Sequence, residues 1–187
     1  MQDNIENIKL KQLWSLPIEK QQSYLNILQC LKSKNKIGKY KIYDLEELPY
    51  ADVVLIQSHF HSAMYDDCLT AMSLSTKQPK IFIEKFCIVE FSHGWNYISD
   101  MISEINKKMQ LLVKPPKPML IDAGIEKLNM FGELNVLTAL AKEYSTTPFE
   151  VEQWPWGFVY ALQLKNKIES DINDDYEILM KAKSKNK

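Results

Sequence analysis

The chain has 187 residues, of which 45% are hydrophobic and 25% charged, and it carries a formal net charge of −1 at pH 7. This composition is typical of a globular protein with one substantial core or two small ones, and the near-zero charge excludes a general attraction to nucleic acid. All 23 basic residues are lysines, so the bidentate clamps that arginine forms on phosphate and guanine are excluded as well.

The sequence carries no sign of export or of a disulfide framework. No apolar run approaches the roughly 18 to 20 residues of a membrane span, and the polar N-terminus does not resemble a signal peptide. We therefore expect the protein to stay in the compartment where it is made. Cys30, Cys68 and Cys87 are odd in number, widely spaced and set among apolar residues, which predicts buried thiols rather than disulfides or a zinc site.

The chain is predicted to begin with two helices and a linker. A short helix is expected within residues 4–14. Residues 17–32 form the second, because Pro17 suits a helix start and an apolar stripe follows it on one face. The members of this stripe are Tyr24, Leu25, Leu28 and Leu31. The segment Lys32–Lys41 contains five lysines, which indicates a solvated linker.

A further helix is predicted to start at Pro49 and to continue through Met64 towards Met72. Several residues of metal-ligand type lie on it: His59, His61, Asp66, Asp67 and Cys68. Residues two apart on a helix point about 200° apart, so His59 and His61 cannot bind the same ion. We predict surface and packing roles for these side chains, and no metal site.

Residues 80–91 are the one strand candidate. Their sequence, KIFIEKFCIVEF, alternates between apolar and polar positions and is rich in Ile, Phe and Val. A short hairpin turning at Glu84 and Lys85 is the other form that this element could take. The predicted fold is therefore mainly α, an amphipathic helical bundle with one short β strand or hairpin near residues 80–91.

A proline-rich run divides the predicted helices into two groups. Helical spacing extends from Trp95 to Val113. The run that follows, residues 114–118 (KPPKP), must be extended, because proline disfavours the α conformation in the residue before it. We predict an N-terminal helical region of residues 1–113, a hinge at residues 114–118 and a C-terminal helical module of residues 119–187.

The C-terminal module is predicted to contain a long helix from about Ala123, because apolar residues follow at spacings of four and three. This seam consists of Met130, Leu134, Leu137, Ala141 and Tyr144. The chain ends in an acidic cluster, a helix-like stretch and alternating lysines. The cluster comprises Asp171, Asp174 and Asp175. We expect this tail to be exposed and frayed.

A tight corner is predicted between these two parts of the module. Thr147 is a good N-cap and Pro148 suits a first helical position, so a short helix begins there. Pro155 cannot continue that helix but can open the next one. Trp154 and Trp156 flank the corner, and we predict that one indole fills the core while the other is exposed to a partner. One apolar face is expected on the helix after the corner, formed by Phe158, Val159, Leu162 and Ile168.

A second version of this corner lies earlier in the chain. Aligning YDLEELPYADVVLIQ (residues 43–57) with FEVEQWPWGFVYALQ matches Pro49 with Pro155 and Tyr50 with Trp156. Two explanations fit the match. The same helix-start signals, acidic residues followed by a proline and an apolar stripe, can recur independently, or a helical unit has been duplicated. Both explanations predict that each proline begins a helix.

A longer stretch, NMFGELNVLTALAKEYSTTPFEVEQWPWGFVYALQLKNK, resembles the C-terminal helical module of tailed-phage tail assembly chaperones and related small virion-assembly proteins. In that module a helix reading L-x-x-L-A-K-x-Y/F is followed by T/S-P-x-E-V/I and a last helix. The matching residues are Leu137, Leu140, Ala141, Lys142, Tyr144, Thr147, Pro148, Glu150 and Val151. The resemblance covers about a third of the chain.

The resemblance implies a non-enzymatic part in building or decorating a phage particle, in multiple copies, in the virion or the host cytoplasm. The expected partners are other virion or assembly proteins of the capsid, portal or tail, bound either as a tail assembly chaperone or as a head- or portal-associated accessory protein. The predicted partner site uses the exposed aromatic residues of the corner and, if the repeat is real, their counterparts. Its residues are Trp154, Trp156, Phe158 and Tyr160, with Tyr50 and Val54 as the equivalent surface.

Two other function classes compete with this one. No P-loop, dinucleotide-binding, nucleophile-elbow or zincin motif is present, so we predict no enzyme, no cofactor and no metal. An enzyme would need a site assembled from distant carboxylates, such as Asp100, Glu104, Asp122 and Glu126. The alternative to a virion protein is a small DNA-binding or regulatory protein that uses the Lys32–Lys41 segment.

Overall fold

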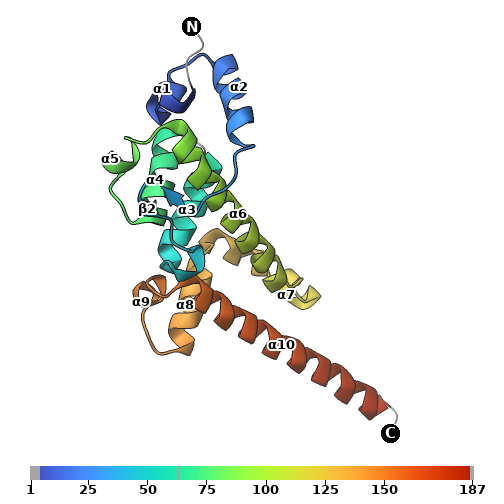
Figure 1. The fold of residues 1–187 in the computed structure, drawn as a ribbon. Helices are drawn as coiled ribbons and strands as arrows, with labels where there is room; N and C mark the ends of the chain where they lie inside the picture. The colour runs from blue at the N-terminus through green and yellow to red at the C-terminus, as the bar shows by residue number, and fades with distance from the viewer. Residues whose placement is uncertain (1–4, 63, 186–187) are drawn as a thin grey trace. The chain divides into compact units, whose positions relative to one another are not determined.

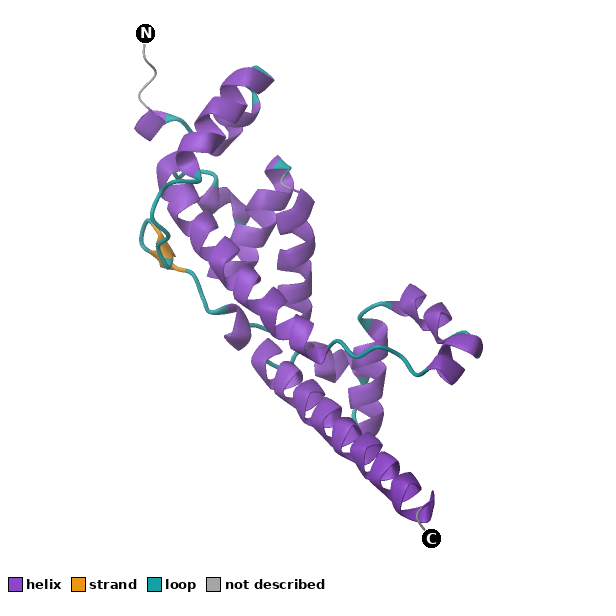
Figure 2. Ribbon diagram, turned by 90° about the vertical axis from the view of Figure 1, so that its right-hand side faces the viewer, coloured by secondary structure: helices purple, strands orange, loops and turns teal. Residues whose placement is uncertain are grey.

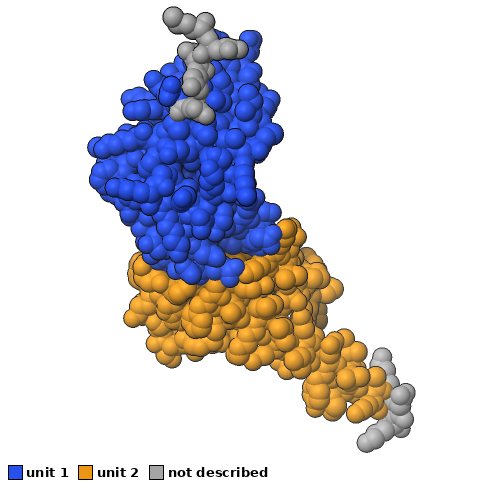
Figure 3. All heavy atoms as spheres, in the orientation of Figure 1, with its two compact units in different colours: residues 1–105 blue, residues 106–187 orange. Residues whose placement is uncertain are grey.

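The chain is helical almost throughout (Figure 1, Figure 2). The computed structural model describes residues 5–62 and 64–185, and their regular structure confirms the predicted mainly α fold. The chain divides into two compact units, residues 1–105 and residues 106–187 (Figure 3). The division falls within α6 (Ile88–Leu112) rather than at the proline-rich run, whose role as a hinge stays a prediction.

Unit 1 opens with η1 (Ile5–Asn7), α1 (Leu10–Trp14) and α2 (Ile18–Leu28). Helix α2 begins directly after Pro17, as predicted, but it ends at Leu28 rather than at residue 32. The side-chain amide of Asn96 donates to the carbonyl of Leu28 (3.1 Å), which the helix end leaves open, and to that of Leu31 (2.8 Å) in the turn beyond it. Leu13 and Leu28 share a buried hydrophobic cluster with Ile88 of α6.

A small β hairpin follows α2, formed by β1 (Lys36–Ile37) and β2 (Tyr40–Lys41). The segment predicted to be a solvated linker therefore contains a hairpin, although its five lysines are all exposed as that prediction requires. Gly38 makes the tight turn with a φ of 53°, in the left-handed region that favours glycine. A Cβ at this position would lie 2.1 Å from the ring of Phe86. The ring therefore packs against the turn and leaves no room for a side chain at residue 38.

The predicted strand at residues 80–91 is also wrong. Pro79 is the N-cap residue of α5 (Lys80–Ile83), and α6 begins at Ile88, before the Trp95 start that its spacing predicted. A short alternating apolar run does not distinguish a strand from two helical turns, and here Ile83 and Ile88 are buried from separate helices. One isolated bridge remains, between Cys87 and Lys9.

The helix predicted from Pro49 to Met72 is broken in two. After η2 (Leu45–Glu47), α3 (Tyr50–Ser62) starts directly beyond Pro49 as predicted, and α4 (Tyr65–Thr76) packs against it. The break is defined by Met64, whose extended backbone (φ −78°, ψ 158°) makes it the N-cap residue of α4.

The three cysteines are free thiols with different exposures. Cys68 is buried, as predicted, and burial raises the pKa of its thiol to about 12. Cys87 is half-buried. The prediction is wrong for Cys30, which is exposed because it lies beyond the end of α2, where its Sγ reaches the carbonyl of Asn26 (3.4 Å).

Unit 2 contains, beyond the end of α6, α7 (Pro118–Asp122), η3 (Ile125–Phe131), α8 (Leu134–Glu143), α9 (Pro148–Glu152) and α10 (Trp156–Lys185). Residues 113–117 have no regular structure, as the prolines predict. The long helix expected from Ala123 starts only at α8, because Gly124 and Gly132 adopt positive φ values of 83° and 47°.

The predicted apolar seam of this region is buried only within α8. Leu137 and Ala141 are buried there, together with Leu140. The other predicted members, Met130, Leu134 and Tyr144, are exposed. The described tail, in contrast, stays helical as far as Lys185, and no residue between 163 and 184 is buried.

Candidate functional site

The corner between α8 and α10 is built from local hydrogen bonds. Thr147 and Glu150 form a capping box, in which the Thr147 amide donates to Glu150 Oε2 (2.9 Å) and the Glu150 amide to Thr147 Oγ1 (3.3 Å). The Thr146 hydroxyl donates to the same carboxylate, and this bond, followed by those from Thr147, lowers the pKa of Glu150. The short helix α9 is therefore fixed at its first turn, as the sequence predicted.

Pro155 then opens α10. Its carbonyl accepts hydrogen bonds from the amides of Phe158 (2.9 Å) and Val159 (3.1 Å), which are the first bonds of the new helix. Proline donates no amide hydrogen, and at this position none is needed. The direction of the chain thus changes between the end of α9 at Glu152 and the start of α10 at Trp156.

The two tryptophans at this corner have different environments, as predicted. Trp156 is buried, with 2% of its surface exposed, and stacks on Tyr160 with ring centroids 5.4 Å apart and planes 6° apart. The ammonium of Lys108 lies 5.7 Å from the centroid of the same Tyr160 ring. Trp154 is only half-buried.

Trp154 is the centre of a surface cluster that we call the aromatic corner: Tyr144, Trp154 and Phe158. The Tyr144 ring meets Trp154 edge-on at 5.9 Å, and the Phe158 ring lies 5.5 Å from it at a tilt of 57°. Tyr144 is 41% exposed and Phe158 is 50% exposed. Three aromatic side chains thus support one another and still offer part of their surface to a partner.

The predicted partner site is only partly realised. Trp156 and Tyr50 are buried, so they present no surface, and Tyr160 and Val54 are half-buried. Phe158, which was also predicted for the partner site, is exposed. Of the other residues on the predicted apolar face of the helix, Val159 and Leu162 are buried, whereas Ile168 is exposed.

Tyr144 belongs to the aromatic corner but was absent from the predicted site. The sequence placed it on a helical seam, three residues after Ala141. In the structure α8 ends at Glu143, and Ser145 adopts a positive φ of 52°, so the chain turns at Tyr144 and its ring meets Trp154. The aromatic spacing alone carries no signal for this contact.

Two of the residues of metal-ligand type, His59 of α3 and Asp67 of α4, are paired across the helix break. His59 Nδ1 lies 2.6 Å from Asp67 Oδ1, and the Ser62 hydroxyl donates to the other oxygen of the same carboxylate. These bonds, that from Ser62 first, lower the pKa of Asp67. A catalytic triad needs the serine on the imidazole, whereas here both groups bind the carboxylate. Within the described residues no cluster of His, Cys, Asp and Glu could hold a metal ion.

The carboxylates that an enzyme would need belong to two different units. Asp100 and Glu104 lie on α6 in unit 1, whereas Asp122 and Glu126 belong to α7 and η3 in unit 2. All four side chains are exposed.

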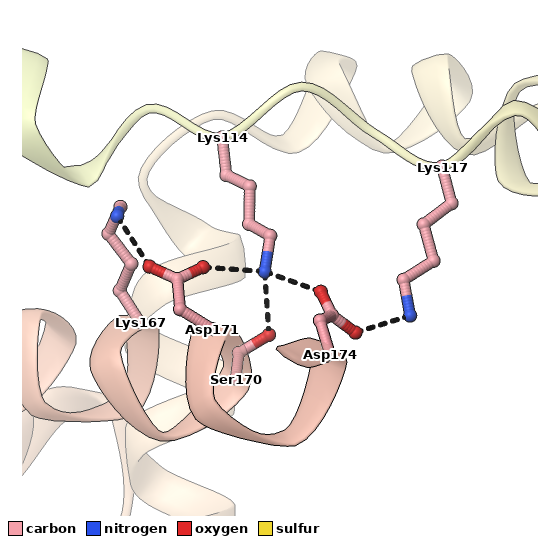
Figure 4. Close-up of polar contacts among 6 residues, drawn as sticks. All are labelled: Lys114, Lys117, Lys167, Ser170, Asp171 and Asp174. Carbon is pink, nitrogen blue, oxygen red and sulfur yellow. Dashed lines mark hydrogen bonds and ion pairs between the residues drawn. The ribbon is translucent and has the colours of Figure 1, made fainter. Parts of the chain in front are cut away.

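An ion-pair network joins the proline-rich segment to α10 (Figure 4). Lys114 Nζ lies 2.7 Å from both Asp171 Oδ1 and Asp174 Oδ2, and Lys117 Nζ lies 2.6 Å from Asp174 Oδ1. Lys167 pairs with the second oxygen of Asp171 (2.8 Å). The hydrogen bonds from Lys114 and then Lys117 lower the pKa of Asp174 to about 2. The acidic cluster therefore fixes a segment some 57 residues earlier in the chain.

No family model matches the chain, and no curated protein or solved structure matches it either. None of the described helices is both long and apolar enough to cross a membrane. The function is therefore argued from the chain's own residues.

Proposed function

We propose that the protein is a non-enzymatic structural or assembly component of a tailed phage, and that it binds another virion protein through the aromatic corner. The observation that carries the proposal is the exposed cluster of Tyr144, Trp154 and Phe158 on a corner held by a capping box. Tyr and Trp are the residue types most enriched at binding hot spots. Because the rings already support one another, they lose little side-chain freedom on binding.

The resemblance to phage tail assembly chaperones supports the same proposal. Its matching residues build the corner: Leu137, Leu140 and Ala141 are the buried face of α8, and Thr147 and Glu150 are the capping box of α9. The proposed partners are capsid, portal or tail proteins. The protein would meet them in multiple copies, in the virion or in the host cytoplasm, as a tail assembly chaperone or as a head- or portal-associated accessory protein.

The proposal is tested by co-purification from infected cells with single Trp154→Ala and Phe158→Ala variants. Each should lose an identified capsid, portal or tail protein while retaining its circular dichroism spectrum. Phe82→Ala is the matched control, because Phe82 is a partly exposed aromatic residue of unit 1. Undiminished recovery of virion proteins by both corner variants, or recovery of DNA or a small-molecule product in their place, contradicts the proposal.

A second candidate function is DNA binding by the hairpin, which the five exposed lysines between Lys32 and Lys41 favour. Some of this charge lies against aromatic rings of the hairpin region, since Lys39 Nζ is 5.4 Å from the Tyr40 centroid and Lys41 Nζ is 5.2 Å from that of Tyr43. Phosphate contacts make affinity fall steeply with salt. A salt titration with duplex DNA therefore tests this candidate, and no binding at low salt excludes it.

A further inference from the structure

Helix α10 has an unpartnered apolar face. Its C-terminal part carries Ile168, Ile172, Tyr176 and Leu179, which we call the outer seam. These side chains are between 49% and 62% exposed. Their spacings of four, four and three place them within a sector of about 80° on a helix with 3.6 residues per turn. This is the spacing by which helices pack against one another along a shared seam.

The side of α10 away from the outer seam is already occupied. Asp171 and Asp174 project from it, and both are bound by Lys114 (Figure 4). Asp174 lies about 160° around the helix from the centre of the seam. The ion-pair network therefore fixes the helix with one side towards the proline-rich segment, and it leaves the outer seam open.

The charges of α10 permit two copies to pair. Its sequence contains five lysines and five acidic residues, so the helix has no net charge. Four of the acidic residues have ion-pair partners within the chain: Glu169, Asp171, Asp174 and Glu177. Because α10 has no net charge, strong like-charge repulsion does not oppose the pairing of two α10 helices.

The apolar area is that of a small homodimer interface. Each half-exposed side chain of the seam contributes roughly 80 Å² of apolar surface, so four provide about 320 Å² per copy. A standard interface buries about 800 Å² per partner, of which somewhat more than half is apolar. The outer seam thus supplies most of the apolar part, and neighbouring polar side chains supply the remainder.

We propose that the outer seam binds the outer seam of a second copy of this chain, so that α10 pairs with α10 in a two-fold symmetric dimer. The same patch serves both copies, which is the commonest arrangement in homo-oligomers. The small area indicates a weak dimer. Dimerisation through the outer seam is independent of any partner that the aromatic corner binds.

The test is sedimentation velocity of the full chain over a concentration series spanning the micromolar range. The wild-type mass should rise from the monomer value of 21.9 kDa towards twice that value. Ile172→Asp and Tyr176→Asp should each weaken the dimer at least about tenfold, because each places a charge in the apolar contact. Both residues are exposed, so the monomer should keep its helical circular dichroism spectrum.

Ile178→Asp is the matched control. Ile178 is 64% exposed on the same helix but lies about 120° around it from the centre of the outer seam. This variant should dimerise as the wild type does. A wild type that stays monomeric at every concentration overturns the inference, as do seam variants that dimerise normally or a control that is weakened equally. Those results leave binding of virion proteins by Trp154 and Phe158 unaffected, so the two proposals fail separately.

Discussion

Replacing Trp156 by Ala should destabilise unit 2 far more than replacing Trp154. The Trp156 indole is buried and stacked on Tyr160, whereas Trp154 is half-buried. A large aromatic side chain buries about 150 to 250 Å², which at about 25 cal/mol per Å² corresponds to roughly 4 to 6 kcal/mol. Relaxation around the cavity reduces this cost, so we expect Trp156→Ala to lower the free energy of unfolding by about 3 to 5 kcal/mol.

The half-buried indole loses proportionately less area, so Trp154→Ala should cost roughly 1 to 3 kcal/mol. For a unit of this size, residues 106–187, 1 kcal/mol corresponds to about 4 to 8 °C in melting temperature. Trp156→Ala should therefore lower the melting temperature of unit 2 by roughly 12 to 40 °C. Calorimetry of the full chain measures this, because it separates the transitions of two units if they unfold independently.

Phe158→Ala is the control for a change in the same helix, since this ring is half exposed and its loss should cost less than that of Trp156. The reasoning is refuted if Trp156→Ala is no more destabilising than Trp154→Ala. Such a result would mean that the space beneath the corner collapses without cost, and that Pro155 alone fixes the direction of α10.

The pKa of Asp174 in the folded chain is about 2, below its ordinary 3.8. Its stabilising contribution is therefore complete above pH 3.8 and is lost as the pH falls towards 2. Acid unfolding followed by circular dichroism should show less pH dependence in this window for Asp174→Asn. Gly38→Ala should cost more than Gly132→Ala in urea unfolding, because both have positive φ but only at Gly38 does the added Cβ meet a ring, that of Phe86. Thr147→Ala should cost about 0.5 to 2 kcal/mol in the same assay through loss of the capping box, and an unchanged unfolding midpoint would contradict this.

The parts of the fold that the sequence predicted are those fixed by neighbouring residues. The start of α9 depends on Thr147 and Glu150, and the start of α10 on Pro155, so the controlling groups lie within one turn of each boundary. The unequal burial of Trp154 and Trp156 follows from the same local geometry, because residues two apart leave a helix start in different directions.

The parts that could not be predicted depend on residues far apart in the chain. The turn at Gly38 is completed by Phe86, and the end of α2 is capped by Asn96. The network around Asp174 joins it to Lys114 and Lys117, which sequence reasoning assigned only to an extended hinge. Lysine and aspartate are common on any surface, so their spacing contains no signal for such a pairing.

The internal repeat is reproduced in the burial of aligned residues, yet it does not reproduce the aromatic corner. Tyr50 and Trp156 are both buried, and so are Val53 and Val159. The residue aligned with Trp154 is Leu48, which is fully buried, and the residue aligned with Phe158 is Asp52, which has no ring.

The shared positions are thus those that fill a core, which convergent packing and duplication explain equally well. Of the two aligned corners, only the one at Pro155 carries the cluster of three aromatic rings. A partner that recognises them would therefore bind each copy of the chain at one site, at Pro155, and the surface at Tyr50 and Val54 would not substitute for it.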